Sequence, residues 1–525
     1  MSRLTTALQK AIATPATDDT FDPHAQLDEV LAGIGMSTKD TGGDVTFLGA
    51  DPVVPSTLRL GGASAIALAA KSAAIVKLWQ LRDGAGQDIA VDLRSAPHRL
   101  CPFYDRRWEL LNGYPPATPS NPSNALGFRF YRTGDDRWMM PLNPYPKIKV
   151  GAQRLLGVPD DSRAAAAAIA EWKAAELEAA ATEAGVVMPM LRTTAELLDE
   201  PHYRDVFADM PLIEITRIAD GEPIEFTPGP EQPLDGVRAL GMGHVIAGAG
   251  VGRALALHGA DVLNLLRPNE LEHDATYATA NVGVRSSTID PYTPDGATTI
   301  AALLDDADVF YANRRPGYLD KIGLSADTVA EKHRGIVYAT ASLNGESGPW
   351  SHQVGFDQTA GSLAGMMLLE GDGETPALPP ILVVNDYIVS WLMTAGIVEA
   401  LTRPARDGGS YRVHVSLTRA ALWIVGMGIF DRAYAHEIAG TDAADGAHRY
   451  LDPETFTAAT PLGDYQGVTD QVRMSVTPVT TARSWYRGVR VGRSGWRGGA
   501  DLPAQVTATV VESRTVGAPL NHACI

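Results

Sequence analysis

The chain has little cysteine, no excess of positive charge and no long unbroken apolar run. Only two of its 525 residues are cysteines, Cys101 and Cys524, so neither a disulfide framework nor a thiolate metal cluster is indicated. The formal net charge of −18 argues against nucleic acid or an anionic membrane as the main partner. The polar N-terminus lacks the apolar core of a signal peptide, and charged residues or proline interrupt every apolar stretch. A cytoplasmic protein without metal or membrane contact is therefore expected.

The second half of the chain alternates short apolar strands with helices. Hydrophobic residues make up 45% of the sequence and charged residues 20%, as in globular proteins. Strands are predicted at GVRAL (236–240), ADVLNLL (260–266), DVFYA (308–312) and GIVYATA (335–341), with helices near 247–259, 296–305 and 325–332. This alternation predicts an α/β fold with a doubly wound parallel sheet.

An internal repeat joins the two halves of the chain. Residues 63–93 and residues 385–417 each read as an amphipathic helix, a glycine-containing turn and an alternating strand. Ile66 aligns with Ile388, and Leu93 aligns with Leu417 after a two-residue insertion. Two unrelated helix–strand units would give the same pattern, and that alternative stays open.

A glycine run at Gly248, Gly250 and Gly252 suggests a dinucleotide-binding loop but does not fit its spacing. Arg253 or Leu255 stands where the third small residue of that fingerprint belongs. The following strand ends in Arg267 rather than in the acid that binds a ribose. Close helix–strand packing explains the glycines as well, and an NADP-dependent reductase stays a minor alternative because Arg267 would suit a phosphate.

Asp386 falls at an N-cap or first-turn position, between the apolar run ILVVN and the helix YIVSWLMTAGIVEAL. A carboxylate there is stabilised by roughly 0.3–1 kcal/mol when exposed, so capping alone would explain it. The repeat places Ser64 at the equivalent position of the first copy. Serine and aspartate both cap helices, whereas forming an anhydride requires a carboxylate. If one copy is catalytic, it is therefore the second.

These segments resemble, in permuted order, the class III CoA-transferase family, which includes formyl-CoA transferase, carnitine CoA-transferase and α-methylacyl-CoA racemase. The resemblance to the family's opening portion runs through 233–268, NVGVRSSTID (281–290), DVFYANRRPGYLDKIGLS (308–325), IVYATASLNGESGP (336–349) and VGFDQTAGSLAG. The first 230 residues resemble the family's later portion, including its small-domain hairpin at NALGFRFYRTGDDRW (124–138). The chain thus looks like two incomplete copies in tandem.

The resemblance implies a Rossmann-like doubly wound sheet domain with a smaller α+β domain, in a homodimer. The expected division is a helix–strand segment at 1–112 that resembles the end of the large domain, a small domain with its return segment at 113–218 and a linker at 219–233. A Rossmann-like CoA-binding catalytic domain at 234–430 and a partly disordered C-terminal segment at 431–525 would follow.

The resemblance also implies the activity and its residues. Coenzyme A would pass between carboxylic acids, as a thioester substrate with no permanently bound cofactor. Asp386 would be the nucleophile, held ionised by the helix N-terminus and supported by Asp357, Gly345 and Gly348. Matching positions predict coenzyme A contacts from His244, Arg267, Arg285, Ile289, Asn313 and Lys321.

The chain departs from the family at several positions. The motif at 281–286 has lost two cations, Asn264 and Leu266 replace the usual lysine and glutamate, and Val354 replaces a lysine seen in formyl-CoA transferase. Phe356 stands where the racemase branch has a histidine base, so a transferase is preferred over a racemase. Another acyl-CoA activity and a catalytically inactive paralogue stay as alternatives.

Overall fold

The computed structural model describes residues 2–18, 20–117, 124–223, 226, 229–441, 446–460, 463–478 and 510–511. The disorder expected for the C-terminal segment falls on residues that lie almost wholly outside these ranges. The domain boundaries expected at 112, 218, 233 and 430 stay predictions.

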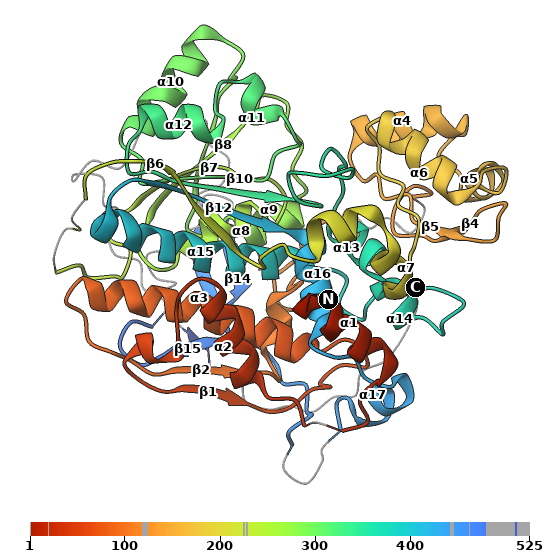
Figure 1. Ribbon diagram of the computed structural model, residues 1–525, viewed down its shortest axis with the longest axis horizontal. Coiled ribbons are helices and arrows are strands. Elements are labelled where there is room, and N and C mark those ends of the chain that lie inside the picture. Colours follow the sequence, from red (N-terminus) through yellow and green to blue (C-terminus); the bar gives the residue numbers. More distant parts are fainter. Residues whose placement is uncertain are drawn as a thin grey trace.

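A large, mostly parallel sheet forms the centre of the molecule (Figure 1). Its strand order is β6 (Glu214–Ala219), β12 (Ser410–Ser416), β11 (Val337–Ser342), β10 (Val309–Ala312), β7 (Arg238–Met242), β8 (Asp261–Leu266) and β9 (Arg285–Thr288). All neighbours are parallel except β6, which runs antiparallel to β12. The first parallel strand of the chain, β7, lies in the middle of the sheet. Strands β8 and β9 follow on one side of it and β10, β11 and β12 on the other, so the strand order reverses between β7 and β10. The predicted α/β class with a large parallel sheet is confirmed.

Helices bury both faces of this sheet. On one face, α10 (Pro294–Asp305) and α12 (Ala326–Lys332) pack on Leu240, Leu263 and Phe310. On the other, α8 (Ala249–Ala256) and α15 (Asn385–Asp407) join the main core. Successive strand residues point to opposite faces, so strands covered on both sides are apolar throughout. This burial explains the continuous apolar runs in the sequence.

The glycine run of α8 permits close packing. An added Cβ at Gly248, Gly250 or Gly252 would lie 2.3 Å from Asn313, 2.6 Å from Ser390 or 2.3 Å from Tyr311, respectively. These approaches are closer than any side chain allows, so glycine is required for α8 to contact β10 and α15. The packing interpretation of the run is confirmed.

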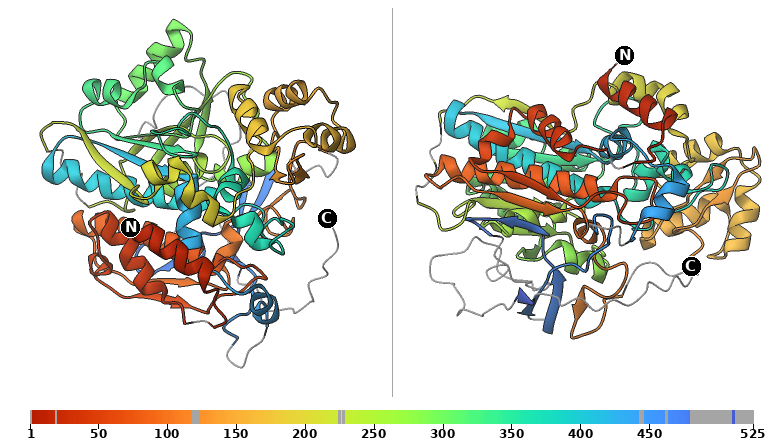
Figure 2. Two further views of the ribbon diagram at one scale, coloured as in Figure 1. Left: turned by 45° about the vertical axis from the view of Figure 1, so that its right-hand side comes forward. Right: turned by 90° about the horizontal axis from the view of Figure 1, so that it is seen from below.

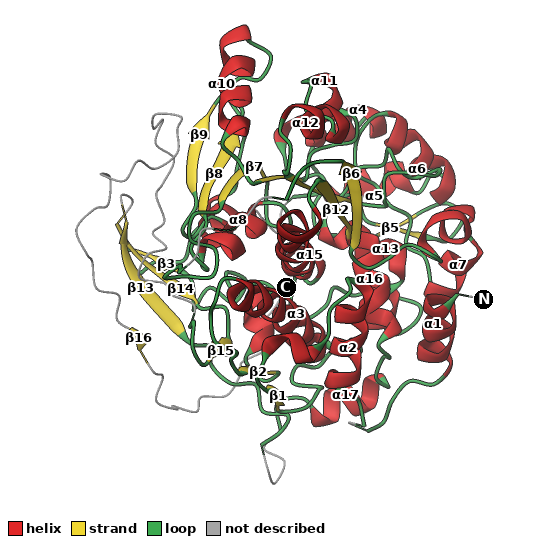
Figure 3. Cartoon of the chain, turned by 60° about the vertical axis from the view of Figure 1, so that its left-hand side comes forward, coloured by secondary structure: helices red, strands yellow, loops and turns green. Residues whose placement is uncertain are grey.

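The repeat forms two similar units that pack against each other. In the first copy, α3 (Leu60–Leu81) leads to β2 (Ile89–Asp92), which lies between parallel β1 (Val45–Leu48) and antiparallel β15 (Val472–Met474). In the second, α15 leads to β12, which likewise lies between parallel β11 and antiparallel β6. Figure 3 shows α3 and α15 side by side, and the two helices are in contact. Helix α3 is long and apolar enough to cross a membrane, but it is buried in this core.

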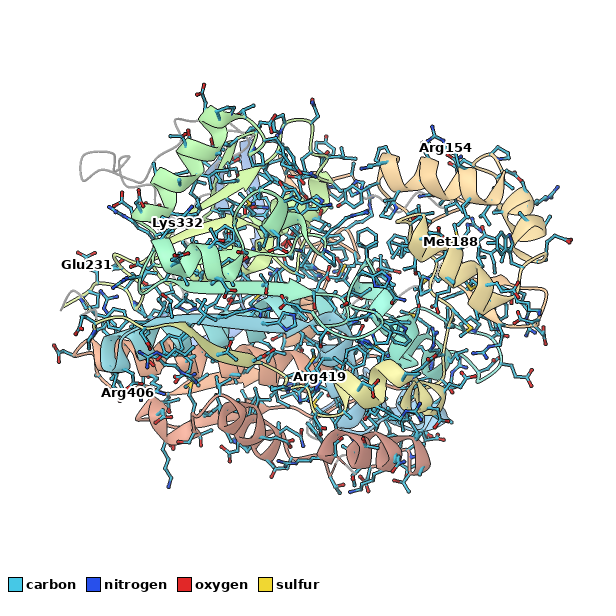
Figure 4. The ribbon with its side chains drawn as sticks, turned by 45° about the horizontal axis from the view of Figure 1, so that its top comes forward. Arg154, Met188, Glu231, Lys332, Arg406 and Arg419 are labelled. Carbon is cyan, nitrogen blue, oxygen red and sulfur yellow. The ribbon has the colours of Figure 1, made fainter. Side chains whose placement is uncertain are left out.

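A smaller lobe stands beside the sheet (Figures 2 and 4). It contains the antiparallel pair β4 (Tyr131–Arg132) and β5 (Trp138–Met139), which confirms the predicted hairpin. Three helices complete it: α4 (Pro146–Leu156), α5 (Ser162–Ile169) and α6 (Ala174–Glu183). The lobe has its own hydrophobic core, which includes Met188, whereas Arg154 on α4 is exposed.

Shorter elements complete the chain. The remaining α-helices of the described chain are α1 (Arg3–Ala13), α2 (Pro23–Gly33), α7 (Thr194–Asp199), α9 (Asp274–Ala280), α11 (Tyr318–Lys321), α13 (Asp357–Ala364), α14 (Met366–Glu370), α16 (Leu417–Gly426) and α17 (Arg432–Ile438). A further antiparallel sheet has the order β16 (Val510–Val511), β13 (Thr455–Thr460), β14 (Gly463–Val468) and β3 (Leu110–Leu111). Strands β14 and β15 pair with β3 and β2, so the C-terminal segment is built into the N-terminal one.

A buried ion cluster joins these distant segments. Asp470 contacts Lys71 of α3, and its carboxylate lies 3.9 Å from Arg99 and 3.8 Å from Arg253 of α8. Arg99 also lies 3.8 Å from Glu109. All five side chains are at most 3% exposed. Charges buried this deeply are tolerated only when paired, so the cluster ties the two halves together.

Candidate active site

One pocket of about 120 Å³ lies where the two halves of the chain meet. The first half contributes Phe103, Tyr104, Arg106, Phe128, Leu142, Pro144 and Tyr145 to its wall. The second half contributes Val245, Ile246, His273, Thr276, Phe356, Asp357, Gln358, Leu382, Val383 and Asp386. The sequence prediction that Asp357 and Asp386 act together is consistent with this geometry, because both line the pocket.

The Asp357 carboxylate caps α15. Its Oδ2 atom accepts the backbone N–H groups of Val384 at 3.0 Å, of Asp386 at 2.9 Å and of Asn385. These amides belong to the unpaired donors at the start of the helix, where negative charge is favoured. Burial raises the pKa of Asp357, and the three amide hydrogen bonds oppose that rise. Asp357 therefore occupies the anion site that the sequence had suggested for Asp386.

Asp386 is the second residue of α15, and its carboxylate is left without a partner. No described residue donates a hydrogen bond to it, and the side chain is only 7% exposed. Burial raises the pKa of Asp386 well above the ordinary value, and the neighbouring Asp357 charge raises it further. The expectation that the helix N-terminus keeps this carboxylate ionised is corrected, because Asp357 takes those amides. A carboxyl group without partners, beside a pocket, is free to react.

The first copy of the repeat keeps the capping carboxylate but lacks the second one. Asp51 accepts the N–H groups of Gly61 at 2.9 Å and of Gly62 at 2.6 Å at the start of α3. Ser64 lies one turn inside this helix, where its hydroxyl donates to the carbonyl of Leu60 at 2.7 Å. The idea that Ser64 is a cap is therefore wrong, and among the described residues a pair like Asp357 and Asp386 forms only in the second copy.

Sequence reasoning missed Tyr145 and His273, which face the same pocket. Their rings lie 4.7 Å apart, and Tyr145 stacks on Phe356 at 5.9 Å. The Tyr145 hydroxyl and the Nε2 atom of His273 are buried without a hydrogen-bond partner in the described chain. Burial raises the pKa of Tyr145, with nearby Glu272 and Asp386 adding to the effect. Buried polar groups are rarely left unpaired, so these atoms suit a polar group of a ligand. Their placement depends on long-range contacts that left no signal in the sequence.

Four of the residues expected to bind coenzyme A lie at one edge of the large sheet. His244 follows β7, Arg267 follows β8, Ile289 follows β9 and Asn313 follows β10. This is the carboxyl edge, at and beside the point where the strand order reverses, and ligands of open α/β sheets bind there. Lys321 ends α11 nearby in the chain and is exposed.

The contacts of these residues divide them by role. The Asn313 side chain accepts the His244 N–H at 2.8 Å and donates to its carbonyl at 2.9 Å, so it ties two loops together. The His244 imidazole contacts Glu272. Arg267 pairs with Glu270 at 3.0 Å but stays 43% exposed. Arg314, which the sequence prediction missed, also contacts Glu270, and both guanidinium groups lie against the Tyr318 ring.

Arg285 does not reach this edge. It is the first residue of β9, and its guanidinium pairs with Asp261, the first residue of β8, at 2.7 Å. Both residues therefore lie at the amino end of their strands. This ion pair holds two strand starts together, and the expected contact between Arg285 and coenzyme A stays a prediction that the position of the side chain does not favour.

Gly345 and Gly348 shape a turn after β11, away from the residues that line the pocket. Their φ angles of 87° and 77° are left-handed, which favours glycine. An added Cβ would lie 2.6 Å from Met210 at Gly345 and 2.6 Å from Val206 at Gly348. These glycines pack against residues 202–210, and their expected support of the nucleophile stays a prediction.

Residues 234–506, just over half of the chain, match the profile of the family described as CoA-transferase family III. The chain belongs to CoA-transferase family III. The profile covers the large sheet from β7 onward together with both pocket aspartates.

Curated relatives of this family III chain include three named CoA-transferases. An acetyl-coenzyme A transferase of Hypoxylon pulicicidum is 30% identical over 38% of this chain and 35% of its own length. The alpha subunit of a succinyl-CoA–L-malate CoA-transferase of Chloroflexus aurantiacus is 30% identical over 41% and 55%. A formyl-CoA:oxalate CoA-transferase of Streptomyces coelicolor is 31% identical over 36% and 48%. The match thus spans about a third to about half of each relative.

Among solved structures, a CAIB/BAIF family protein of Brucella suis matches with a TM-score of 0.35 and 26% identity. The match covers 37% of this chain and 56% of that protein.

Proposed function

We propose that this protein is a CoA-transferase that moves coenzyme A between carboxylic acids, with Asp386 as its nucleophile. One observation carries the proposal: the Asp386 carboxyl group lines the pocket and accepts no hydrogen bond from the described chain, while Asp357 takes the helix amides. A capping aspartate would be engaged with those amides. A nucleophile must have free lone pairs.

The proposed reaction has four steps. A carboxylate oxygen of Asp386 attacks the thioester carbon, and the coenzyme A thiolate leaves a mixed anhydride behind. The thiolate attacks the aspartyl carbonyl, which releases the donor acid and forms an aspartyl thioester. The acceptor carboxylate attacks that thioester and again releases the thiolate. The thiolate then attacks the acceptor acyl carbon, which yields the new thioester and restores the Asp386 carboxylate.

The electrostatics of the pocket affect the first step. The nucleophile must be ionised, whereas burial and the Asp357 charge favour the protonated form of Asp386. Two carboxyl groups this close do not ionise independently, so the first proton leaves the pair more easily than the second. The proposal therefore includes an activity that rises with pH as Asp386 ionises.

Tyr145 supplies a hydrogen-bond donor to the pocket wall. We assign its hydroxyl to the thioester carbonyl oxygen, because Tyr145 lines the pocket and its buried hydroxyl has no partner among the described residues. A donor aimed at the oxygen that becomes negative in the tetrahedral intermediate stabilises the transition state. His273, whose Nε2 atom is also unpaired, lies against the same tyrosine ring.

Coenzyme A itself is proposed to bind at the carboxyl edge of the large sheet, which we interpret as a Rossmann-like domain. The parallel strands follow the order third, second, first, fourth, fifth, sixth, which supports this interpretation. Arg267 and Lys321 are exposed cations suited to phosphates, and His244, Ile289 and Asn313 would line the nucleotide.

The relatives' names support the substrate type, since all three describe transfer of coenzyme A or of acyl groups bound to it. The homodimer and the cytoplasmic location stay predictions. The pocket is lined by both halves of one chain. Sedimentation analysis would settle the oligomeric state.

Racemisation and loss of catalysis are the competing functions. Phe356 supplies no base beside Asp357, which disfavours the two-base arrangement of the racemase branch. Exchange of the α-hydrogen of an acyl-CoA with heavy water would reveal a racemase.

Covalent trapping tests the proposal directly. The protein is incubated with acyl-CoA and then with hydroxylamine or borohydride, and the peptide containing residue 386 is weighed. Modification of Asp386, and loss of transfer in Asp386→Ala but not in the exposed control Asp295→Asn, would support transfer. An unmodified Asp386 in a protein that transfers coenzyme A would refute the assigned nucleophile.

A further inference from the structure

The wall of the pocket is mostly apolar on both sides of Asp386. Its apolar lining residues come from six separate parts of the chain: Phe103, Phe128, Leu142, Pro144, Val245, Ile246, Phe356, Leu382 and Val383. Several of them pack into the main core or against it. A group that enters here leaves water for hydrocarbon, which favours an apolar ligand by about 25 cal/mol per Å² buried.

Three polar side chains of this wall are already engaged within the protein. The Gln358 amide donates to the carbonyl of Leu382 at 2.6 Å, and the Thr276 hydroxyl donates to the carbonyl of His273 at 3.0 Å. Asp357 accepts three amides. Apart from the Asp386 carboxyl group, the buried unpaired polar atoms among the described lining residues are the Tyr145 hydroxyl and the Nε2 atom of His273, which the thioester oxygen would satisfy. Little polar capacity is left for a second polar group on the acyl chain.

The cations near the pocket do not suit a carboxylate inside it. Of the described residues that line the pocket, only Arg106 is an arginine or a lysine, and its side chain is exposed. It lies beside Tyr104, which is 45% exposed, so both mark the mouth. A carboxylate at the far end of an acyl chain would be buried without a cation, and burying an unpaired charge is very costly.

Resting on the proposed function, we infer that the acyl group carried by this enzyme is apolar and has no charged end: an aliphatic, branched or aromatic acyl-CoA. Phe356 and the stacked Tyr145 form the wall beside Asp386, and the aromatic residues of the first half cover the acyl chain. Specificity arises because the pocket rejects a second carboxylate.

The inference is tested with a panel of thioesters of similar size. Transfer from benzoyl-CoA and isovaleryl-CoA is compared with transfer from succinyl-CoA, with one acceptor acid throughout. We expect kcat/KM to be at least tenfold higher for the apolar thioesters. Equal values, or a preference for succinyl-CoA, would overturn the inference.

Two variants place the cause in the pocket. Phe128→Arg adds a cation to the lining and should reduce the apolar preference, whereas Val150→Arg, on the exposed face of α4, should leave it unchanged. If both variants behave alike, the preference does not arise in this pocket.

Binding separates this inference from the proposed function. Thioether analogues of benzoyl-CoA and succinyl-CoA cannot transfer, and calorimetry measures their affinity whether or not the protein is catalytic. Tighter binding of the benzoyl analogue, without transfer of any acyl group, would sustain the apolar pocket and refute the transferase. Tighter binding of the succinyl analogue would refute the apolar pocket even if transfer occurs.

Discussion

The backbone N–H of Asp386 donates to the carboxylate of Asp357 at 2.9 Å, so one aspartate holds the helix that presents the other. Asp357 is satisfied by three amides, whereas the carboxyl group of Asp386 has no donor in the described chain. The two carboxyl groups share one pocket and one electrostatic environment. Asp357 therefore has a structural role and Asp386 a reactive one, and substitutions of the two residues should have different effects.

Asp386→Asn should stabilise the fold at neutral pH. In the folded protein the pKa of Asp386 is raised, so as pH climbs above the ordinary value near 3.9 the unfolded chain ionises and the folded one does not. The wild type thus loses stability with rising pH, until the folded carboxyl group also ionises. The variant should be more stable by about 1–3 kcal/mol at pH 7 and equal near pH 3. Urea denaturation across this pH range measures the difference.

Asp357→Ala is the matched variant and should have the opposite effect. It leaves three buried backbone amides without an acceptor at the start of α15. Loss of these bonds should cost about 2–4 kcal/mol at pH 7. If both variants changed the stability in the same direction, the assignment of structural and reactive roles would be wrong.

Asp357→Asn should shift the pH dependence of transfer. The substitution keeps an oxygen acceptor for the amides but removes the charge that helps to raise the pKa of Asp386. The acid limb of log kcat/KM should therefore move to lower pH, by about one unit. Glu370→Gln is the control, because burial raises the pKa of Glu370 to about 7 but its side chain contacts Ser56 rather than the pocket. If the acid limb of log kcat/KM stayed unchanged in Asp357→Asn, or moved equally in Glu370→Gln, the proposed effect of the Asp357 charge on Asp386 would be wrong.

The sequence predicted what depends on local periodicity. The strands and helices of the second half, each helix–strand unit of the repeat and the first-turn position of Asp386 all follow from local spacing. Gly252 was interpreted correctly because the helix that packs on β10 requires a small residue there. These features arise from backbone geometry, which nearby residues determine.

What the sequence missed depends on contacts between distant segments. Asp357 precedes Asp386 by 29 residues, and its loop had to fold back before it could take the helix amides. Tyr145 reaches the pocket from the other half of the chain, and β15 crosses back to β2. The ionisation of Asp386 was predicted wrongly for the same reason, because burial is a property of the packed fold.

Tyr145→Phe should lower kcat with little effect on folding. The hydroxyl has no partner in the described chain, so its loss costs no internal hydrogen bond. If it stabilises the developing oxyanion, kcat should fall about 10–100-fold with a small change in KM. Tyr131→Phe is the control in the same lobe, because its hydroxyl donates to the carbonyl of Ala125 at 2.7 Å. Tyr131→Phe should lose about 1 kcal/mol of stability and keep its kcat. If Tyr145→Phe instead kept its kcat, Tyr145 would have no role in the mechanism.

Asp470→Asn should unfold the chain more readily than any surface charge variant. Asp470 is the anion that faces Lys71, Arg99 and Arg253, and neighbouring cations hold its pKa below the ordinary range although burial opposes this. Removing its charge leaves three buried cations with the single carboxylate of Glu109, so we expect a loss of about 3–5 kcal/mol. Arg3→Met, which breaks an exposed pair with Glu29, should change stability by less than about 0.5 kcal/mol. Guanidinium denaturation at fixed pH compares the two variants.

Equal small effects of the two variants on stability would show that the cluster does not hold the halves together. A large loss of stability for Asp470→Asn alone would show that the cluster does hold the halves together. The Thr279 hydroxyl donates to Glu109 of the cluster and lies 2.9 Å from the Tyr387 hydroxyl. Because Tyr387 belongs to the first turn of α15, the same variant should also loosen the turn that carries Asp386.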